Sequence, residues 1–121
     1  MKSFFTHDLH EEKINNVQFD IGSYIPLLKT KDNDWKYLTE FQIITKNYTI
    51  FVYNPFILEL NSDPKCLIGD KILKVVTNEN TFKFEMESGE ILTIDLRDES
   101  YIGPEALCIY GPNDLIVVWN W

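Results

Sequence analysis

Apolar and polar residues alternate over much of the second half of the chain. Apolar side chains occupy every second position over residues 82–86 and again over residues 92–96, with charged or hydroxyl-bearing residues between them. A period of two is typical of strands that are buried on one face only. The pattern therefore predicts two neighbouring β-strands.

The loop between these two runs determines how the strands pair. Directly opposed residues of an antiparallel pair lie on the same face of the sheet. A two-residue loop at Ser88-Gly89 would set Phe84 opposite Thr93, which mixes the two faces. A three-residue loop over residues 87–89 sets Phe84 opposite Leu92, and it places Gly89 where such a loop needs a left-handed residue. We therefore predict the three-residue hairpin.

Two further hairpins follow from the same test. Residues 40–53 form one if the loop is Lys46-Asn47, which sets Ile43 opposite Ile50 and gives Asn47 the positive φ that asparagine tolerates. Residues 106–119 form the other, with its turn at residues 111–114. Both arms of this last hairpin are almost entirely apolar, which predicts central strands or strands covered on both faces.

The start of the chain permits two interpretations. Residues 13–17 resemble residues 71–75, and a hairpin follows each of them, which suggests a strand-plus-hairpin unit used twice and closed by the third hairpin. Residues 8–16 can also form a short helix, with Asp8 as N-cap and Glu11 as its capping-box partner.

These elements predict a mainly β fold. We expect a single domain over residues 1–121, built as an antiparallel β-sandwich or half-open barrel of about seven to eight strands with one short N-terminal helix. Proline, glycine and charge mark the loops, which we place at residues 29–35, 54–56, 61–69 and 97–105.

Composition limits the cellular setting. The 121 residues are 45% hydrophobic, enough for a core, but they contain no signal-peptide pattern and no apolar run near the roughly 18 residues of a membrane-spanning helix. We therefore expect a cytoplasmic protein that does not enter a membrane. In that compartment Cys66 and Cys108 should be reduced, buried thiols rather than a disulfide.

Catalytic chemistry has little support in the sequence. His7, His10 and Glu11 would form a poor metal site, and a polar helix start explains them as well. No serine lies in a nucleophile elbow, no glycine-rich loop is present to hold phosphate, and Arg97 is the only arginine. We expect no enzyme, no metal and no cofactor.

Negative charge is spread unevenly along the chain. The formal net charge is −8. Residues 1–60 hold 8 acids and 6 lysines, whereas residues 61–121 hold 11 acids against 4 lysines and Arg97. Such a field repels nucleic acid and anionic membranes, and it attracts basic partners.

Many of these acids lie close together in the sequence, around a tyrosine. We predict that this group binds a protein partner, with tyrosine supplying buried area and the acids steering a cationic surface. Alternatively, Arg97 pairs with a neighbouring acid, Tyr101 and Ile102 close the end of the core, and the acids only face water. The predicted contact residues are Glu87, Glu90, Asp95, Asp98, Glu99, Tyr101 and Glu105.

The stretch from residue 69 to residue 119 resembles small β-rich bacterial proteins. The features that carry the resemblance are residues 72–76, the turn Ser88-Gly89, residues 101–105 and residues 115–119. Such proteins are similar to immunity proteins of toxin systems, including contact-dependent growth inhibition. The resemblance implies a protein that binds one toxin domain and occludes its active site. A basic nuclease toxin, either an RNase or a DNase, would match the acidic charge.

A different class of function also fits the composition. A small-ligand or carbohydrate-binding β-sandwich could use Trp35, Tyr37 and Trp119 or Trp121 as stacking surfaces. A purely structural domain is the third possibility. The sequence leaves open whether the chain is a monomer or a homodimer sealed at its aromatic C-terminal end.

Overall fold

A computed structural model describes residues 9–29, 35–101 and 103–120 of the chain. Within these residues it contains strands and two short 3₁₀ helices, η1 and η2. The strands are β1 (Ile14–Lys29), β2 (Trp35–Thr45), β3 (Thr49–Val52), β4 (Phe56–Leu58), β5 (Ile72–Thr77), β6 (Thr81–Met86), β7 (Ile91–Asp95), β8 (Glu105–Tyr110) and β9 (Ile116–Asn120). The 3₁₀ helices are η1 (Pro64–Leu67) and η2 (Asp98–Ser100). The mainly β fold is confirmed, with nine described strands in place of the seven or eight expected.

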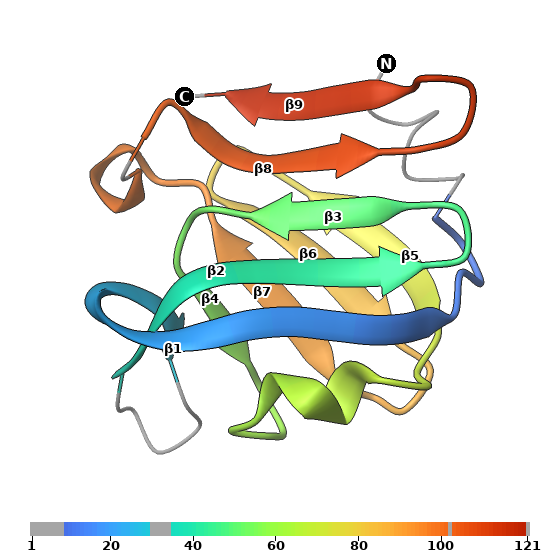
Figure 1. The fold of residues 1–121 in the computed structure, drawn as a ribbon, viewed down its shortest axis with the longest axis horizontal. Helices are drawn as coiled ribbons and strands as arrows, with labels where there is room; N and C mark the ends of the chain where they lie inside the picture. The colour runs from blue at the N-terminus through green and yellow to red at the C-terminus, as the bar shows by residue number, and fades with distance from the viewer. Residues whose placement is uncertain (1–8, 30–34, 102, 121) are drawn as a thin grey trace.

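Hydrogen bonds connect the strands in the order β5-β6-β7-β4-β1-β2-β3-β8-β9. Neighbours pair antiparallel except β1 and β4, which pair parallel where Leu28 and Lys29 lie beside Phe56 and Ile57. Figure 1 shows β1, β2, β3, β8 and β9 as one layer in front of β4, β5, β6 and β7. The long strand β1 links the two layers, since its end pairs with β4 and the residue before it, Lys13, bridges to Lys71 ahead of β5.

The prediction of a helix over residues 8–16 is wrong for residues 9–16, the part of it that the structure describes. Residues 9–11 form a turn, and Glu11 has a φ of 64°, which a right-handed helix excludes. The Glu11 N–H donates to the Ile72 carbonyl at 2.6 Å, and Leu9 is fully buried. Contacts with β5 therefore override the local capping signal. Asp8 lies outside the described residues.

The β6–β7 hairpin has the predicted register. Phe84 pairs with Leu92 and Phe82 with Ile94. The Met86 N–H donates to the Glu90 carbonyl at 2.9 Å, which closes the three-residue loop, and Gly89 has a φ of 96°. Loop length and one glycine therefore predicted which side chains face the core.

The β2–β3 hairpin is also confirmed, but its turn differs from the prediction. Ile43 pairs with Ile50, and the Thr45 N–H donates to the Tyr48 carbonyl at 2.9 Å. Asn47 is not among the described residues with positive φ. The Thr45 hydroxyl instead accepts from the Tyr48 N–H at 3.0 Å, which supports this turn without a left-handed residue.

The two similar segments form equivalent parts of the fold. β1-β2-β3 and β5-β6-β7 are each three antiparallel strands in sequence order. At their starts the Ile14 N–H donates to the Asp70 carbonyl at 2.8 Å, and the Ile72 N–H donates to the Glu12 carbonyl at 2.9 Å. The following strands are exchanged between them: β4 pairs with β7, and β8 pairs with β3.

Aromatic side chains fill the space between the layers. Phe41 on β2 stacks on Phe56 on β4 with ring centroids 4.5 Å apart. Trp119 on β9 meets Phe82 on β6 edge-on at 4.7 Å. Both contacts join strands of different layers, so the buried rings hold the two layers together.

The described residues contain no helix long and apolar enough to cross a membrane. Both thiols are free, as predicted, although Cys66 is only half-buried while Cys108 is buried. Burial and, secondarily, the carboxylates of Glu90, Asp63 and Asp70 raise the pKa of Cys66 to about 11. Cys66 therefore stays protonated and poorly nucleophilic at neutral pH.

The left-handed conformation of Gly89 generates a first prediction. A Cβ at Gly89 would make only an ordinary contact, 3.9 Å from Leu60 Cδ1, so Gly89→Ala should cost backbone strain alone. We expect the free energy of unfolding in urea to fall by about 1–2 kcal/mol. Gly103→Ala is the matched control, because Gly103 has open space and no positive φ. Equal effects of the two substitutions would contradict this account.

Candidate interaction surfaces

The predicted contact residues lie in two groups at opposite ends of β7. Glu87 and Glu90 belong to the β6–β7 turn before the strand, whereas Asp95 and the residues of η2 come at its end. A five-residue strand rises about 3.3 Å per residue, so roughly 15 Å separates the groups. They therefore do not form one compact surface.

Glu90 serves the interior rather than the surface. Its side chain is buried, with only 1% of the residue exposed. Oε1 accepts from the N–H groups of Leu60 and Ile91, each at 2.9 Å, and Oε2 accepts from Asn61 Nδ2 at 2.8 Å. This carboxylate ties the loop after β4 to the start of β7, so it cannot touch a partner.

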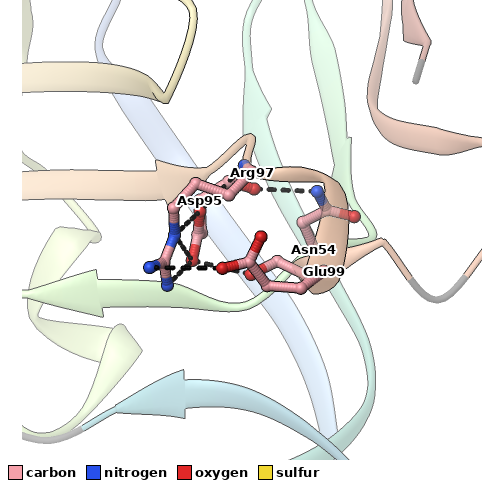
Figure 2. A network of polar contacts seen from close by, with 5 residues as sticks. Asn54, Asp95, Arg97 and Glu99 are labelled. Atoms are coloured by element: carbon pink, nitrogen blue, oxygen red, sulfur yellow. Dashed lines mark hydrogen bonds and ion pairs between the residues drawn. The ribbon is translucent and has the colours of Figure 1, made fainter.

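The group at the other end of β7 forms a connected polar network around Asp95 (Figure 2). Arg97 Nε and Nη2 donate to the two oxygens of Asp95 at 3.0 and 2.7 Å, and the Ser100 hydroxyl donates to Oδ2 at 2.7 Å. Glu99 Oε2 lies 3.6 Å from Arg97 Nη1. We name Asp95, Arg97, Asp98 and Glu99 the acidic corner.

The acidic corner keeps a negative charge in spite of its arginine. Partial burial opposes ionisation of Asp95, but hydrogen bonds from Arg97 and Ser100 outweigh it and lower the pKa of Asp95 below its usual value. Hydrogen bonding to Asp95 raises the pKa of Arg97. One guanidinium thus stands among three acidic side chains, and Asp98 and Glu99 are exposed.

Tyr101 lies against the end of the core. It is half-buried and packs on the buried cluster, and burial together with the charge of Asp98 raises its pKa. Two contacts of the alternative interpretation are therefore present: Arg97 pairs with a neighbouring acid, and Tyr101 packs against the end of the core. Ile102, which that interpretation also places there, lies outside the described residues. The side chains of Asp98 and Glu99 are exposed beside these contacts.

A buried asparagine joins the acidic corner to the neighbouring layer. Asn54 is fully buried, and its Nδ2 donates to the Asp95 carbonyl at 2.8 Å (Figure 2). The N–H groups of Tyr53 and Asn54 both donate to the Ala106 carbonyl, at 2.8 and 3.1 Å. Glu105, at the start of β8, is thereby held close to the corner and to Tyr53.

Aromatic side chains form a face on the outer side of the front layer, and this face begins at Tyr53. Phe51 stacks near Tyr53 with ring centroids 6.5 Å apart, and Tyr110 meets Phe51 edge-on at 5.4 Å. Tyr110 pairs in turn with Ile116 across β8 and β9. Tyr53, Tyr110 and Ile116 are 39%, 42% and 58% exposed. We name Phe51, Tyr53, Tyr110 and Ile116 the aromatic face.

The predicted contact residues do not include this face, although the sequence carries a signal for it. Residues 43–51 and both arms of the last hairpin carry apolar residues on both sides. The pattern led us to expect strands that are central or covered on both faces. For β9 this is wrong, because β9 ends the strand order and Ile116 is exposed. An apolar strand left uncovered on one face indicates a binding surface.

A cavity of about 270 Å³ opens on the other side of the acidic corner. Its lining combines apolar side chains with hydroxyl and charged groups. The lining residues are Pro55, Ile57, Asn80, Thr81, Thr93, Asp95 and Arg97. The buried hydroxyl of Thr81 has no hydrogen-bond partner among the described residues.

One residue of the predicted stacking surface, Trp119, is not available to a ligand. Trp119 is 9% exposed and packs on Phe82, so it offers no open ring face. Tyr37 is exposed, whereas nothing is described of the Trp35 side chain or of Trp121.

The suggested metal site also gains no support. His10 Nδ1 lies 2.5 Å from the Leu73 carbonyl, a contact that uses one of its ring nitrogens. His7 lies outside the described residues. Across the part of the chain that the structure describes, no three His, Cys, Asp or Glu side chains gather as a metal site.

Comparisons of this chain with protein-family models, with curated proteins and with solved structures found no match. The resemblance to immunity proteins therefore stays a prediction.

The buried carboxylate of Glu90 generates a second prediction. Glu90→Ala removes the acceptor for three donors, so the free energy of unfolding should fall by about 2–4 kcal/mol. Glu90→Gln keeps one oxygen for Leu60 and Ile91, and Asn61 can turn its amide oxygen toward the new NH₂ group. It should cost less than about 1 kcal/mol. Urea denaturation measures both, and a Glu90→Gln loss as large as that of Glu90→Ala would contradict this arrangement.

The lowered pKa of Asp95 generates a third prediction. A carboxylate whose pKa is lower in the folded state adds stability above its unfolded pKa of about 3.9, and it loses that contribution as the pH falls. At pH 7, Asp95→Asn should reduce the free energy of unfolding by about 0.5–1 kcal/mol, because the pair with Arg97 is partly exposed. The difference between variant and parent should shrink below about pH 4. A difference independent of pH would rule out the ion pair as its source.

Proposed function

We propose that this chain is an inhibitory binding protein, an immunity protein that occludes the active site of a basic toxin. The observation that carries the proposal is the meeting of two surfaces. The acidic corner and the aromatic face adjoin where Asn54 bonds to both the Asp95 and Ala106 carbonyls. Exposed carboxylates therefore lie next to exposed aromatic rings.

Charge supports a basic partner. With a net charge of −8, the chain attracts cationic proteins over a long range and speeds their encounter. A nuclease needs cationic groups in its active site to hold phosphate. The carboxylates of Asp98 and Glu99 are exposed, so they can compete with phosphate for those groups. Occlusion of this kind requires affinity and no reactive side chain.

The aromatic face supplies binding energy that charge alone does not. Rings at the centre of an interface carry much of its binding energy, while the surrounding polar residues exclude water. Tyr53 and Tyr110 also present ring faces on which a partner's Arg or Lys can lie. Glu105 contributes to the raised pKa values of both tyrosines, after the larger effects of burial and Cys108 on Tyr53 and of Cys108, burial and Tyr53 on Tyr110. The face is therefore bordered by an acid.

Of the contact residues predicted from the sequence, this proposal keeps Asp98, Glu99, Tyr101 and Glu105 beside the aromatic face, with Asp95 holding Arg97 in place. Glu87 lies at the far end of β7 and contributes only to long-range attraction, and Glu90 contributes only to folding. The cavity beside Asp95 is lined mainly by apolar surface, and the Asp95 carboxylate is already paired with Arg97, so the cavity suits an apolar side chain of the partner.

The proposal is tested with charge-reversed bait. Tagged wild-type chain and the double variant Asp98→Lys/Glu99→Lys are used to capture proteins from the source organism, and each captured basic protein is assayed for cleavage of RNA and DNA. We expect one nuclease that the wild type inhibits in equimolar complex. The double variant should bind it at least about tenfold more weakly.

The matched control is Glu59→Lys. Glu59 is exposed and its N–H bonds to the Ile91 carbonyl, so the control reverses charge beside the opposite end of β7. It should bind and inhibit nearly as the wild type does. The proposal fails if the control weakens binding as much as the double variant, or if the captured protein keeps its activity in the complex.

A further inference from the structure

The two ends of the described sheet are protected very differently. The strand order ends in β5 on one side and in β9 on the other. An unprotected edge strand offers a row of N–H and C=O groups to any strand that approaches it. Which edge is covered therefore determines where another chain can add.

The start of the β5 edge, at Ile72 and Leu73, is covered by the chain itself. The Glu11 N–H donates to the Ile72 carbonyl at 2.6 Å, the Ile72 N–H donates to the Glu12 carbonyl at 2.9 Å, and the His10 ring contacts the Leu73 carbonyl. β5 also carries Lys74, and Lys71 precedes it. Lysine on an edge strand is a common protection against pairing.

Among the described residues, nothing gives the β9 edge either kind of protection. The Gly111 N–H donates to the Leu115 carbonyl at 2.9 Å, so the antiparallel alternation directs the N–H and C=O groups of Val117 toward β8. Those of Ile116 and Val118 point away from β8, toward the open edge. No other described strand lies beside them.

The composition of β9 makes this edge suited to pairing. Ile116–Asn120 contains no charged residue, no proline and no glycine, and it is rich in β-branched residues. β3 and β4 are also uncharged, but both lie inside the strand order. In a chain of net charge −8, β9 is thus the one described edge strand that two copies can bring together without opposing like charges.

We propose that β9 pairs antiparallel with β9 of a second copy of this chain, about a two-fold axis. Each copy then fills the open edge of the other, and the interface is closed by symmetry. A head-to-tail arrangement would need β5, whose first residues are covered by residues 10–13 and which carries Lys74 further along. The edge therefore favours a closed dimer over a growing fibre. The inference does not rest on the proposed function, because it concerns the isolated chain.

The test begins with the isolated full-length chain. Sedimentation and light scattering over a range of concentrations should show a monomer–dimer equilibrium. Amide hydrogen exchange should show Val118 becoming more protected as the concentration rises, while the amides of β5 stay unchanged. A chain that remains monomeric at every concentration, or that forms open polymers, would overturn the proposal.

Two variants with a matched control locate the interface. Ile116→Lys places like charges across the two-fold axis at a side chain that is 58% exposed, so the fold should tolerate it. Val118→Pro removes an outward N–H that β8 does not use. Each should raise the dimer dissociation constant at least about tenfold. Leu73→Lys adds the same charge on β5, at a side chain that is 38% exposed, and should leave dimerisation unchanged.

The variants also decide between this surface and others. If Val118→Pro lowers the thermal midpoint sharply, Ile116→Lys alone decides the matter. A dimer that survives Ile116→Lys, or that Leu73→Lys weakens equally, would place the contact elsewhere and overturn the proposal. Because no partner protein is present, failure here leaves the inhibition experiment on Asp98 and Glu99 unaffected.

Discussion

Burial of aromatic side chains between the two layers is the interaction on which the rest of the structure depends. Each three-stranded unit has one apolar face, which is unstable in water until something covers it. Here the exchanged strand and the last strand help to cover these faces, since Phe41 on β2 packs on Phe56 of β4 and Phe82 on β6 packs on Trp119 of β9. The exchange of β4 and β8 between the units strengthens the association, because the chain must pass from one layer to the other twice.

Those two passages bring the candidate surface together. The chain leaves β3 for β4 at residues 53–55, and it leaves β7 for β8 at residues 96–104. Asn54, in the first passage, bonds to the Asp95 and Ala106 carbonyls, which flank the second. The acidic corner and the aromatic face thus adjoin because both crossings occur at the same end of the layers. Backbone groups that leave a sheet need other partners, and a buried amide supplies them.

Strands that are apolar on both sides are the second consequence of this topology. β3, β8 and β9 use one face for the core and leave Phe51, Tyr110 and Ile116 on the other. A soluble surface generally avoids such a patch unless it binds something. The same strands end at an uncharged edge, so the front layer presents both a face and an edge to other molecules. The back layer presents mainly the alternating polar residues of β6 and β7.

The sequence by itself determined the local structure and little of the site. Period-two alternation, loop length and Gly89 were enough to predict the β6–β7 register, since a hairpin depends on neighbouring residues alone. Only the tertiary structure decided that Glu90 is buried, that roughly a strand's length separates Glu87 from Asp95, and that residues 9–11 turn to cover β5. The unevenness of charge was visible in the sequence, but its division into separate groups was not. Strand order and the covering of faces arise from contacts between distant segments, which no local pattern encodes.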